Sequence, residues 1–297
     1  MHVTHRLRGA LLALALAGGV ATAGATAAHA APPAGVVQAA PAHAADAPQV
    51  LAKAAHLVDA TTGQVHLSKD ADLRRPVASL TKMMTAYVVL QEADPADKVT
   101  VTSADVSYAS RGGAAVAYLR AGDTLTVEDL LYALMLPSGA DAAHTLARAF
   151  GPGVEAFVDK MNATARQLGM NDTLYVNADG MPYGGGGHST ARDQVRLAQA
   201  VLADPTLKKV TSTRYHTVPA TSEHRSYSWR NTNRLLGSYG ALGVKTGYTR
   251  AAGFTLAFAA ERGDSTLVGV LLGETSSTRR FQTAGALLDW AAAAARR

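Results

Sequence analysis

The order of hydrophobic patterns along the chain constrains its fold more than any other feature. Apolar residues alternate on both sides of Thr61–Gln64, which is typical of a β-hairpin. Helical periodicity begins after Ala78, where Leu80, Met84, Tyr87 and Val88 line one face. Strand patterns return from about residue 213 to 273. This order predicts one sheet built from both chain ends, with an all-α insertion between them.

The inserted region divides into several predicted helices, and the last third into strands. Thr126 and Asp129 form a capping box that opens a helix through Leu136. Residues 99–125 are predicted as short strands and loops. Further helices are expected over 138–150, 154–168, 190–202 and 277–294, and strands over 213–219, 225–230, 241–246, 253–260 and 265–273.

Composition excludes several classes of protein. The 297 residues are 48% hydrophobic, enough for a substantial core, which rules out a disulfide miniprotein, a collagen-like fibre and a mainly disordered chain. The absence of cysteine rules out disulfides and thiolate metal sites. The ten histidines are scattered and form no H-E-x-x-H motif, so no metal or cofactor is expected. The net charge of +5 is too small to favour nucleic acid as a partner.

The first 30 residues have the features of a signal peptide. Arg6 and Arg8 form a basic segment, Leu11–Ala17 is apolar but too short to span a membrane, and Ala28–Ala30 offers a small-x-small cleavage pattern. We therefore expect cleavage after Ala30 and a secreted, extracytoplasmic protein, in solution or associated with the cell wall. Residues 31–52 are rich in Ala and Pro and are expected to form a flexible tail before a domain over 53–297.

Three short motifs carry groups suited to acyl transfer. Ser79 and Lys82 are three residues apart at a predicted helix start, so their side chains share a face. A buried lysine in that turn has a lowered pKa and can act as a neutral base toward the serine. Ser138 lies at a turn between two predicted helices, where it can project into a cleft and relay a proton. Lys245, Thr246 and Gly247 end a predicted strand, where they can bind a carboxylate.

The order S-x-x-K, then Ser138, then K-T-G is found in penicillin-binding proteins and β-lactamases. With flanking segments such as Pro76–Thr85, Gly180-Met181-Pro182 and Ser189–Asp193, the chain resembles the low-molecular-mass penicillin-binding proteins of the serine D-alanyl-D-alanine carboxypeptidase family, peptidase family S11, over roughly residues 52–290. The resemblance implies an α/β (α+β) fold of the β-lactamase/transpeptidase type, with an antiparallel sheet from both chain ends flanked by helices. Residues 53–297 would be the catalytic domain.

The resemblance also implies a role for each motif residue. Ser79 would attack the D-Ala–D-Ala carbonyl, Lys82 would take its proton, and Ser138 would pass a proton to the leaving D-alanine. Lys245 and Thr246 would hold the terminal carboxylate of a peptidoglycan stem peptide.

Backbone N–H groups of Ser79 and Tyr248 would form the oxyanion hole. Gly247 would let the substrate approach the backbone. Arg280 aligns with an arginine that the family places near the carboxylate, and its neighbour Arg279 stays open as the alternative. β-Lactam antibiotics would acylate Ser79. The chain ends soon after Trp290, so no stable membrane anchor is expected.

One position departs from the family pattern: Ala140 stands where an asparagine usually ends the second motif. The missing hydrogen bond predicts slower or narrower activity. Alternatives therefore stay open: a DD-transpeptidase or endopeptidase with the same acyl-enzyme, or a weakly active wall-binding protein. A β-lactamase is disfavoured, because no glutamate occurs between Glu155 and Glu223 to activate the deacylating water.

Overall fold

The computed structural model describes residues 47–183 and 185–294. The predicted signal peptide and most of the predicted tail lie outside these residues. No helix within the described ranges is long and apolar enough to cross a membrane.

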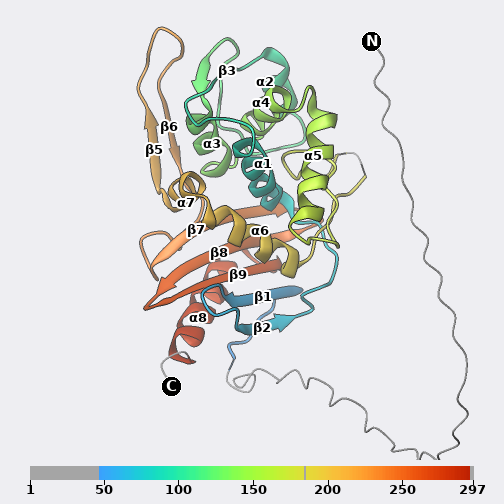
Figure 1. Ribbon diagram of the computed structural model, residues 1–297, viewed down its shortest axis with the longest axis vertical. Coiled ribbons are helices and arrows are strands. Elements are labelled where there is room, and N and C mark those ends of the chain that lie inside the picture. Colours follow the sequence, from blue (N-terminus) through green and yellow to red (C-terminus); the bar gives the residue numbers. More distant parts are fainter. Residues whose placement is uncertain (1–46, 184, 295–297) are drawn as a thin grey trace, which may run out of the picture. The chain divides into compact units, whose positions relative to one another are not determined.

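A five-stranded antiparallel sheet joins the two ends of the described chain, as the sequence predicts. The strand order is β2-β1-β9-β8-β7, so a strand from the beginning of the domain lies beside the last one (Figure 1). The strands are β1 (Ala54–Asp59), β2 (Val65–Lys69), β7 (Ala241–Thr249), β8 (Gly253–Arg262) and β9 (Ser265–Glu274).

Alternate residues of the central strands face two separate cores. In β9, Val268, Val270 and Leu272 belong to the larger core, whereas Leu267 and Leu271 belong to the smaller one, as the two-residue period of a strand requires. Helix α6 (Ala191–Ala203) packs over the first face and α8 (Ser277–Ala294) over the second (Figure 1). The buried apolar runs of the sheet follow from this cover on both faces.

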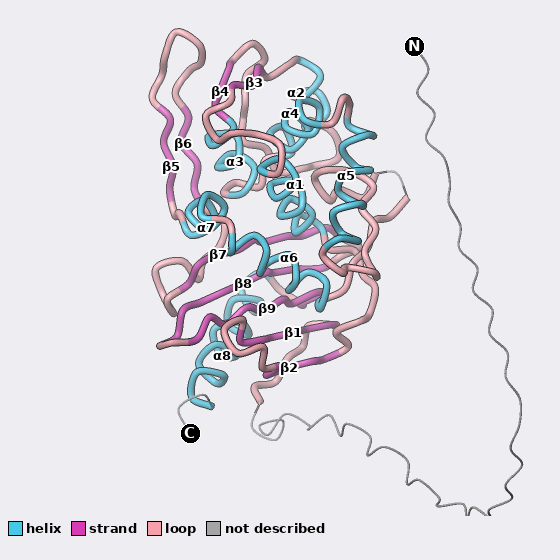
Figure 2. Tube along the Cα trace, in the orientation of Figure 1, coloured by secondary structure: helices cyan, strands magenta, loops and turns pink. Residues whose placement is uncertain are grey.

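The inserted region is mainly helical but not entirely so. Besides α6, its helices are α1 (Thr81–Leu90), α2 (Ser103–Ala109), α3 (Val127–Met135), α4 (Ala140–Phe150), α5 (Val154–Gln167) and α7 (Pro205–Ser212). It also contains two small antiparallel ribbons, one of β3 (Lys98–Thr100) and β4 (Thr124–Thr126), the other of β5 (Tyr215–Val218) and β6 (Tyr227–Arg230) (Figure 2). The predicted strands near 213–219 and 225–230 therefore exist but form their own ribbon.

Two helices differ from the sequence prediction. Residues 99–125 include α2, which begins with a capping box in which Thr102 and Asp105 satisfy each other's backbone N–H. The predicted helix ending near Leu202 is followed directly by α7, which Asp204 caps and which begins with Pro205.

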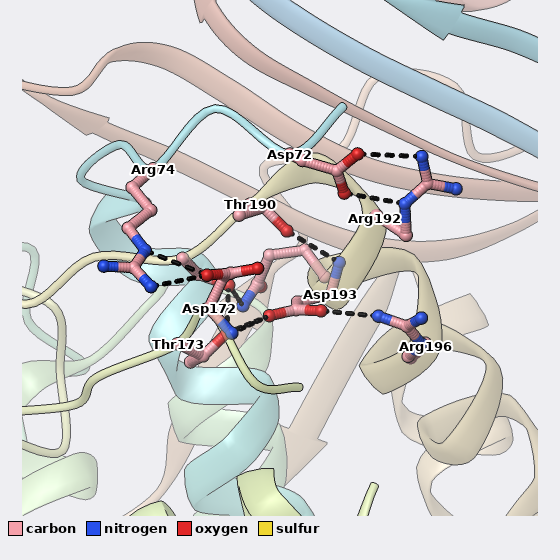
Figure 3. A network of polar contacts seen from close by, with 10 residues as sticks. Asp72, Arg74, Asp172, Thr173, Thr190, Arg192, Asp193 and Arg196 are labelled. Atoms are coloured by element: carbon pink, nitrogen blue, oxygen red, sulfur yellow. Dashed lines mark hydrogen bonds and ion pairs between the residues drawn. The ribbon is translucent and has the colours of Figure 1, made fainter. Parts of the chain in front are cut away.

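A polar network fixes the segment that leads into α1 (Figure 3). Arg192 forms two hydrogen bonds to Asp72, of 2.7 and 3.0 Å, and Arg74 binds Asp172. Asp193, only 3% exposed, accepts hydrogen bonds from the Asp172 backbone at 3.0 Å and from Arg196 at 2.6 Å. The network links the residues before Ser79 to the start of α6 and to the loop after α5, so three distant segments keep one arrangement.

Candidate active site

Ser79 lies in a 3₁₀ turn (Ala78–Leu80) that leads directly into α1. Ala78 has a φ of 52°, a left-handed conformation that is unfavourable for alanine and is held by its surroundings. Gly180 packs so closely that a Cβ there would overlap the Ala78 carbonyl oxygen. The turn before the serine is therefore fixed by backbone packing.

Lys82 points from the first turn of α1 toward Ser79. Its Nζ lies 3.1 Å from Ser79 Oγ and donates a 2.7 Å hydrogen bond to the Asp179 carbonyl oxygen. The side chain is 1% exposed. Burial lowers the pKa of Lys82 to about 8, although the negative charges of Asp179 and Asp141 raise it. The lysine thus has the buried position and lowered pKa that a base for the serine requires.

Ser138 precedes α4 but does not cap it, because Gly139 occupies the N-cap. Its φ of 70° turns the residue out of the helix path. Ser138 Oγ is buried and has no hydrogen-bond partner among the residues described. An unpaired buried hydroxyl is costly unless it serves a ligand, and Ser138 lines the same cleft as Ser79 and Lys82.

Ala140 is completely buried at the start of α4, and its N–H donates to the Ala115 carbonyl at 2.8 Å. Its methyl group can offer Lys82 no hydrogen bond. The Asp179 carbonyl already accepts one from Lys82 Nζ, which supplies the lysine with a partner.

Strand β7 brings the third motif to the cleft. Lys245 is 1% exposed, and its Nζ donates a 2.9 Å hydrogen bond to the Thr246 carbonyl. Burial lowers the pKa of Lys245 well below its ordinary value, and the positive charges of Lys82 and Arg280 lower it further. The Thr246 hydroxyl lies 2.7 Å from the hydroxyl of Thr232.

Gly247 and Tyr248 follow on the same strand. A Cβ on Gly247 would overlap the Thr255 hydroxyl and lie 3.0 Å from the Ser79 backbone nitrogen. Only glycine therefore lets β7 approach the Ser79 turn this closely. The Tyr248 ring is 55% exposed at the cleft and stacks on Phe254, with ring centroids 4.5 Å apart.

Of the two neighbouring arginines, Arg280 faces the cleft and Arg279 is exposed. Arg280 Nη1 donates to the carbonyls of Gly247 at 2.9 Å and Thr255 at 3.1 Å. Burial lowers the pKa of Arg280 to about 10, so its guanidinium is charged at neutral pH. Its Nε is buried without a partner among the described residues.

A cleft of about 560 Å³ joins these groups. Of the catalytic and substrate-binding residues predicted from the sequence, Lys245 does not line it and is bonded to Thr246, which does. The others form its wall: Ser79, Lys82, Ser138, Thr246, Gly247, Tyr248 and Arg280.

Two residues of the site have no motif of their own. Asp179 contributes a backbone carbonyl, and Thr232 a hydroxyl beside Thr246. The Gly180-Met181-Pro182 segment was the only sequence signal near Asp179, and none marked Thr232. Among the described residues no group of three or more His, Asp or Glu side chains could hold a metal ion.

The architecture matches solved DD-transpeptidases. A crystal structure of the Streptomyces K15 DD-transpeptidase superposes with a TM-score of 0.78 at 37% identity, covering 82% of this chain and 98% of that one. A D-alanyl-D-alanine carboxypeptidase from Mycobacterium tuberculosis H37Rv gives 0.77 at 33% identity, covering 85% and 95%. The fold is therefore the DD-transpeptidase fold, and the class is that of serine DD-peptidases.

Residues 41–276 match the family described as peptidase S11, D-alanyl-D-alanine carboxypeptidase, and the chain belongs to that family. It is 37% identical over 270 residues to a D-alanyl-D-alanine carboxypeptidase of Streptomyces sp. strain K15, covering 86% of this chain and 92% of that protein. It is 30% identical over 262 residues to a D-alanyl-D-alanine endopeptidase of Escherichia coli K12, covering 87% and 83%. It spans 62% of the length of a Bacillus subtilis carboxypeptidase, with 32% identity over 246 residues that cover 81% of this chain.

Proposed function

We propose that the protein is a serine D-Ala-D-Ala carboxypeptidase that removes the terminal D-alanine from peptidoglycan stem peptides. The observation that carries the proposal is the 3.1 Å contact between Ser79 Oγ and a buried Lys82 whose pKa is about 8. At that pKa an appreciable fraction of Lys82 is neutral at physiological pH and can take the serine proton as Oγ attacks. The family acts on D-Ala-D-Ala peptides of the cell wall, which supports the choice of substrate.

In the proposed reaction, Ser79 Oγ forms an ester with the penultimate D-alanine, and the peptide C–N bond breaks. The backbone N–H groups of Ser79 and Tyr248 stabilise the oxyanion. Ser138, with its free hydroxyl, passes a proton to the leaving nitrogen. Water then hydrolyses the ester and regenerates the serine.

The substrate carboxylate has a second effect in this scheme. When it binds at Thr246, it raises the pKa of Lys245 and favours the ammonium form. The charges of the carboxylate and of the Lys245 ammonium oppose each other at Lys82, so substrate binding is expected to leave the pKa of Lys82 close to its value in the free enzyme.

The test is covalent labelling. Intact-mass analysis after incubation with benzylpenicillin is expected to show one adduct on the wild-type chain and none on Ser79→Ala. Release of D-alanine from a peptide ending in D-Ala-D-Ala is expected to disappear in the same variant. A wild-type chain that is neither labelled nor able to release D-alanine refutes the proposal.

A transpeptidase that uses the same acyl-enzyme is the second candidate, supported by the similarity to the Streptomyces K15 DD-transpeptidase. Adding an amine acceptor separates the two activities. A carboxypeptidase yields mainly the hydrolysed peptide, whereas a transpeptidase yields the amide of the acceptor.

The weakly active wall-binding alternative depends on Ala140. Because Lys82 already donates to the Asp179 carbonyl, Ala140→Asn is expected to change D-alanine release by less than about tenfold. A much larger gain from a nearly inactive wild type would favour a decayed site.

Enzymes of this family act on the cell wall, outside the cytoplasm. We propose that residues 1–30 direct export and are removed, leaving the tail over 31–52 and the catalytic domain over 53–297. N-terminal sequencing of the exported protein is expected to begin at Ala31, and an intact Met1 would contradict this.

A further inference from the structure

One exposed tyrosine of the helical region is held in an unfavourable backbone conformation. Tyr118 has a φ of 59°, in the left-handed region that large side chains rarely adopt. Its side chain is 74% exposed, so burial of the ring does not offset the strain. Conformations of this kind persist only where the surrounding structure imposes them, and they cluster at sites that bind ligands.

The backbone on both sides of this tyrosine is fixed by other parts of the chain. The buried carboxylate of Asp141, in α4, accepts 2.9 Å hydrogen bonds from the N–H groups of Ala117 and Leu119. Trp229 Nε1, in β6, donates to the Ala117 carbonyl at 2.9 Å. The Arg225 guanidinium donates to the carbonyl of the tyrosine itself. These contacts, and not the preference of the tyrosine, set its conformation.

The ribbon of β5 and β6 that supplies two of these contacts is anchored by a stack of aromatic rings. His216 of β5 stacks on Tyr132 of α3, with ring centroids 3.7 Å apart. Trp229 follows at 6.2 Å from His216, and Tyr227 at 5.3 Å from Trp229. The exposed Tyr118 ring is therefore presented on a preformed support, which lowers the entropy lost when a ligand binds.

The Tyr118 ring lines two clefts at once. One has a volume of about 830 Å³ and shares Pro137, Thr232 and Arg280 with the catalytic cleft. The other has a volume of about 500 Å³. The apolar part of its wall is formed by Val106, Ala109, Val116, Leu119 and Ala121. A ligand that crosses the ring would be an extended one, and its path would continue toward the catalytic cleft.

The charge around the ring favours a neutral ligand. The Asp123 carboxylate accepts hydrogen bonds from the Tyr227 hydroxyl and the Arg225 backbone. The Arg225 guanidinium lies over the Tyr227 ring at 5.1 Å, so a carboxylate close by offsets its charge. The hydroxyl groups of Ser226 and Ser228, in the larger cleft, can donate and accept hydrogen bonds without charge.

A polysaccharide has the surface that fits this arrangement. A sugar ring has an apolar C–H face that can pack on an aromatic ring, and its edge has hydroxyl and amide groups that bind polar side chains. We propose that Tyr118 and the two clefts beside it bind the glycan strand of peptidoglycan, an N-acetylated polysaccharide. One sugar ring packs on Tyr118, and its neighbours lie in the two clefts. The choice of this glycan rests on the proposed function, whereas the binding itself does not use Ser79.

Calorimetry with the Ser79→Ala chain tests the site. The ligands are chito-oligosaccharides, which are uncharged, and peptidoglycan strands from which the stem peptides have been removed. Adding Tyr118→Asn is expected to weaken both affinities about tenfold, because the ring is lost. Asparagine adopts the left-handed conformation more readily than tyrosine, so the melting temperature is expected not to fall. Tyr118→Phe keeps the ring and is expected to bind within about threefold of the parent chain.

Tyr215→Asn is the matched control. Tyr215 is also exposed, at 56%, but lines neither cleft, so this substitution is expected to leave both affinities unchanged. A parent chain that does not bind the uncharged oligosaccharides overturns the inference. So does an unchanged affinity or a lower melting temperature in Tyr118→Asn, or an equal loss of affinity in Tyr118→Phe or Tyr215→Asn.

The binding experiment is separate from the proposed function, because every chain in it lacks the Ser79 hydroxyl. If the wild type neither releases D-alanine nor reacts with benzylpenicillin, the proposed function fails. The calorimetry then still decides the glycan site.

Discussion

The pH dependence of the rate at which Ser79 is acylated, on its acidic side, tests the proposal that Lys82 is the base. At pH 7 a pKa of about 8 leaves about one lysine in eleven neutral, whereas the ordinary pKa of 10.5 leaves about one in 3,000. Burial of this side chain therefore supplies the neutral base at about 300 times its ordinary abundance. The gain corresponds to about 3.4 kcal/mol of differential stabilisation.

If neutral Lys82 accepts the proton, the rate of Ser79 acylation rises about tenfold per pH unit below pH 8 and levels off above it. Stopped-flow measurements with a fluorescent penicillin between pH 6 and 9.5 give this profile directly. A rate independent of pH over this range, or one still rising steeply at pH 9.5, refutes the reasoning.

Asp179→Asn tests the electrostatic origin of this pKa, because it removes a negative charge near Lys82. The Asp179 carboxylate raises the pKa of Lys82, while the hydrogen bond to Lys82 comes from the backbone and survives the substitution. In Asp179→Asn, the midpoint of the plot of acylation rate against pH is therefore expected to move to lower pH. Asp264→Asn, at an exposed position between β8 and β9 and outside the cleft, is the control and is expected to leave the midpoint in place. An unmoved midpoint in Asp179→Asn contradicts the electrostatic argument.

Three further outcomes follow from packing and burial. Gly247→Ala places a methyl group 3.0 Å from the Ser79 nitrogen and is expected to slow acylation by about a hundredfold, measured with the same penicillin; a change under threefold contradicts the close approach. Asp141→Ala removes the carboxylate that accepts hydrogen bonds from three backbone N–H groups, so urea denaturation is expected to show about 3 kcal/mol less unfolding free energy, and a loss below 0.5 kcal/mol opposes this. Burial lowers the pKa of His56 to about 4, so between pH 6.5 and 4 the unfolded chain binds a proton that the folded chain does not. As the pH falls through this window, wild type is expected to lose about 3 kcal/mol more unfolding free energy than His56→Leu. Parallel plots of unfolding free energy against pH for the two chains would refute this expectation.

The sheet and the contact between Ser79 and Lys82 could be predicted because local patterns encode them. Alternation on both sides of Thr61–Gln64 marks β1 and β2, a nearly continuous apolar run marks β9, and the three-residue spacing of Ser79 and Lys82 places both on one helical face. The helices α2 and α7 were missed although their signals are present: Thr102 with Asp105 is a capping box, and Asp204 followed by Pro205 is a helix start. Neither helix exceeds eight residues, so each offers only about two turns over which a helical period could be recognised.

The contacts made by the Asp179 carbonyl and by Thr232 could not be predicted from the sequence, and the reason is physical. Lys82 finds its replacement partner in the Asp179 carbonyl, and a backbone carbonyl is present at every position whatever the side chain. Thr232 meets Thr246 only because the loop after β6 folds back onto β7. Contacts of this kind depend on the tertiary path and leave no pattern in the sequence.

The pairing of β1 with β9 has a consequence for the export proposed above. If the chain crosses the membrane N-terminus first, the turn of Ser79 emerges early, whereas β7, which carries Lys245 and Tyr248, emerges near the end. Until β7, β8 and β9 close the sheet, the chain presents Ser79 without the groups proposed to make it reactive. Partly translocated chains are therefore expected not to react with β-lactams, and the protein is expected to become reactive only once nearly all of it has crossed.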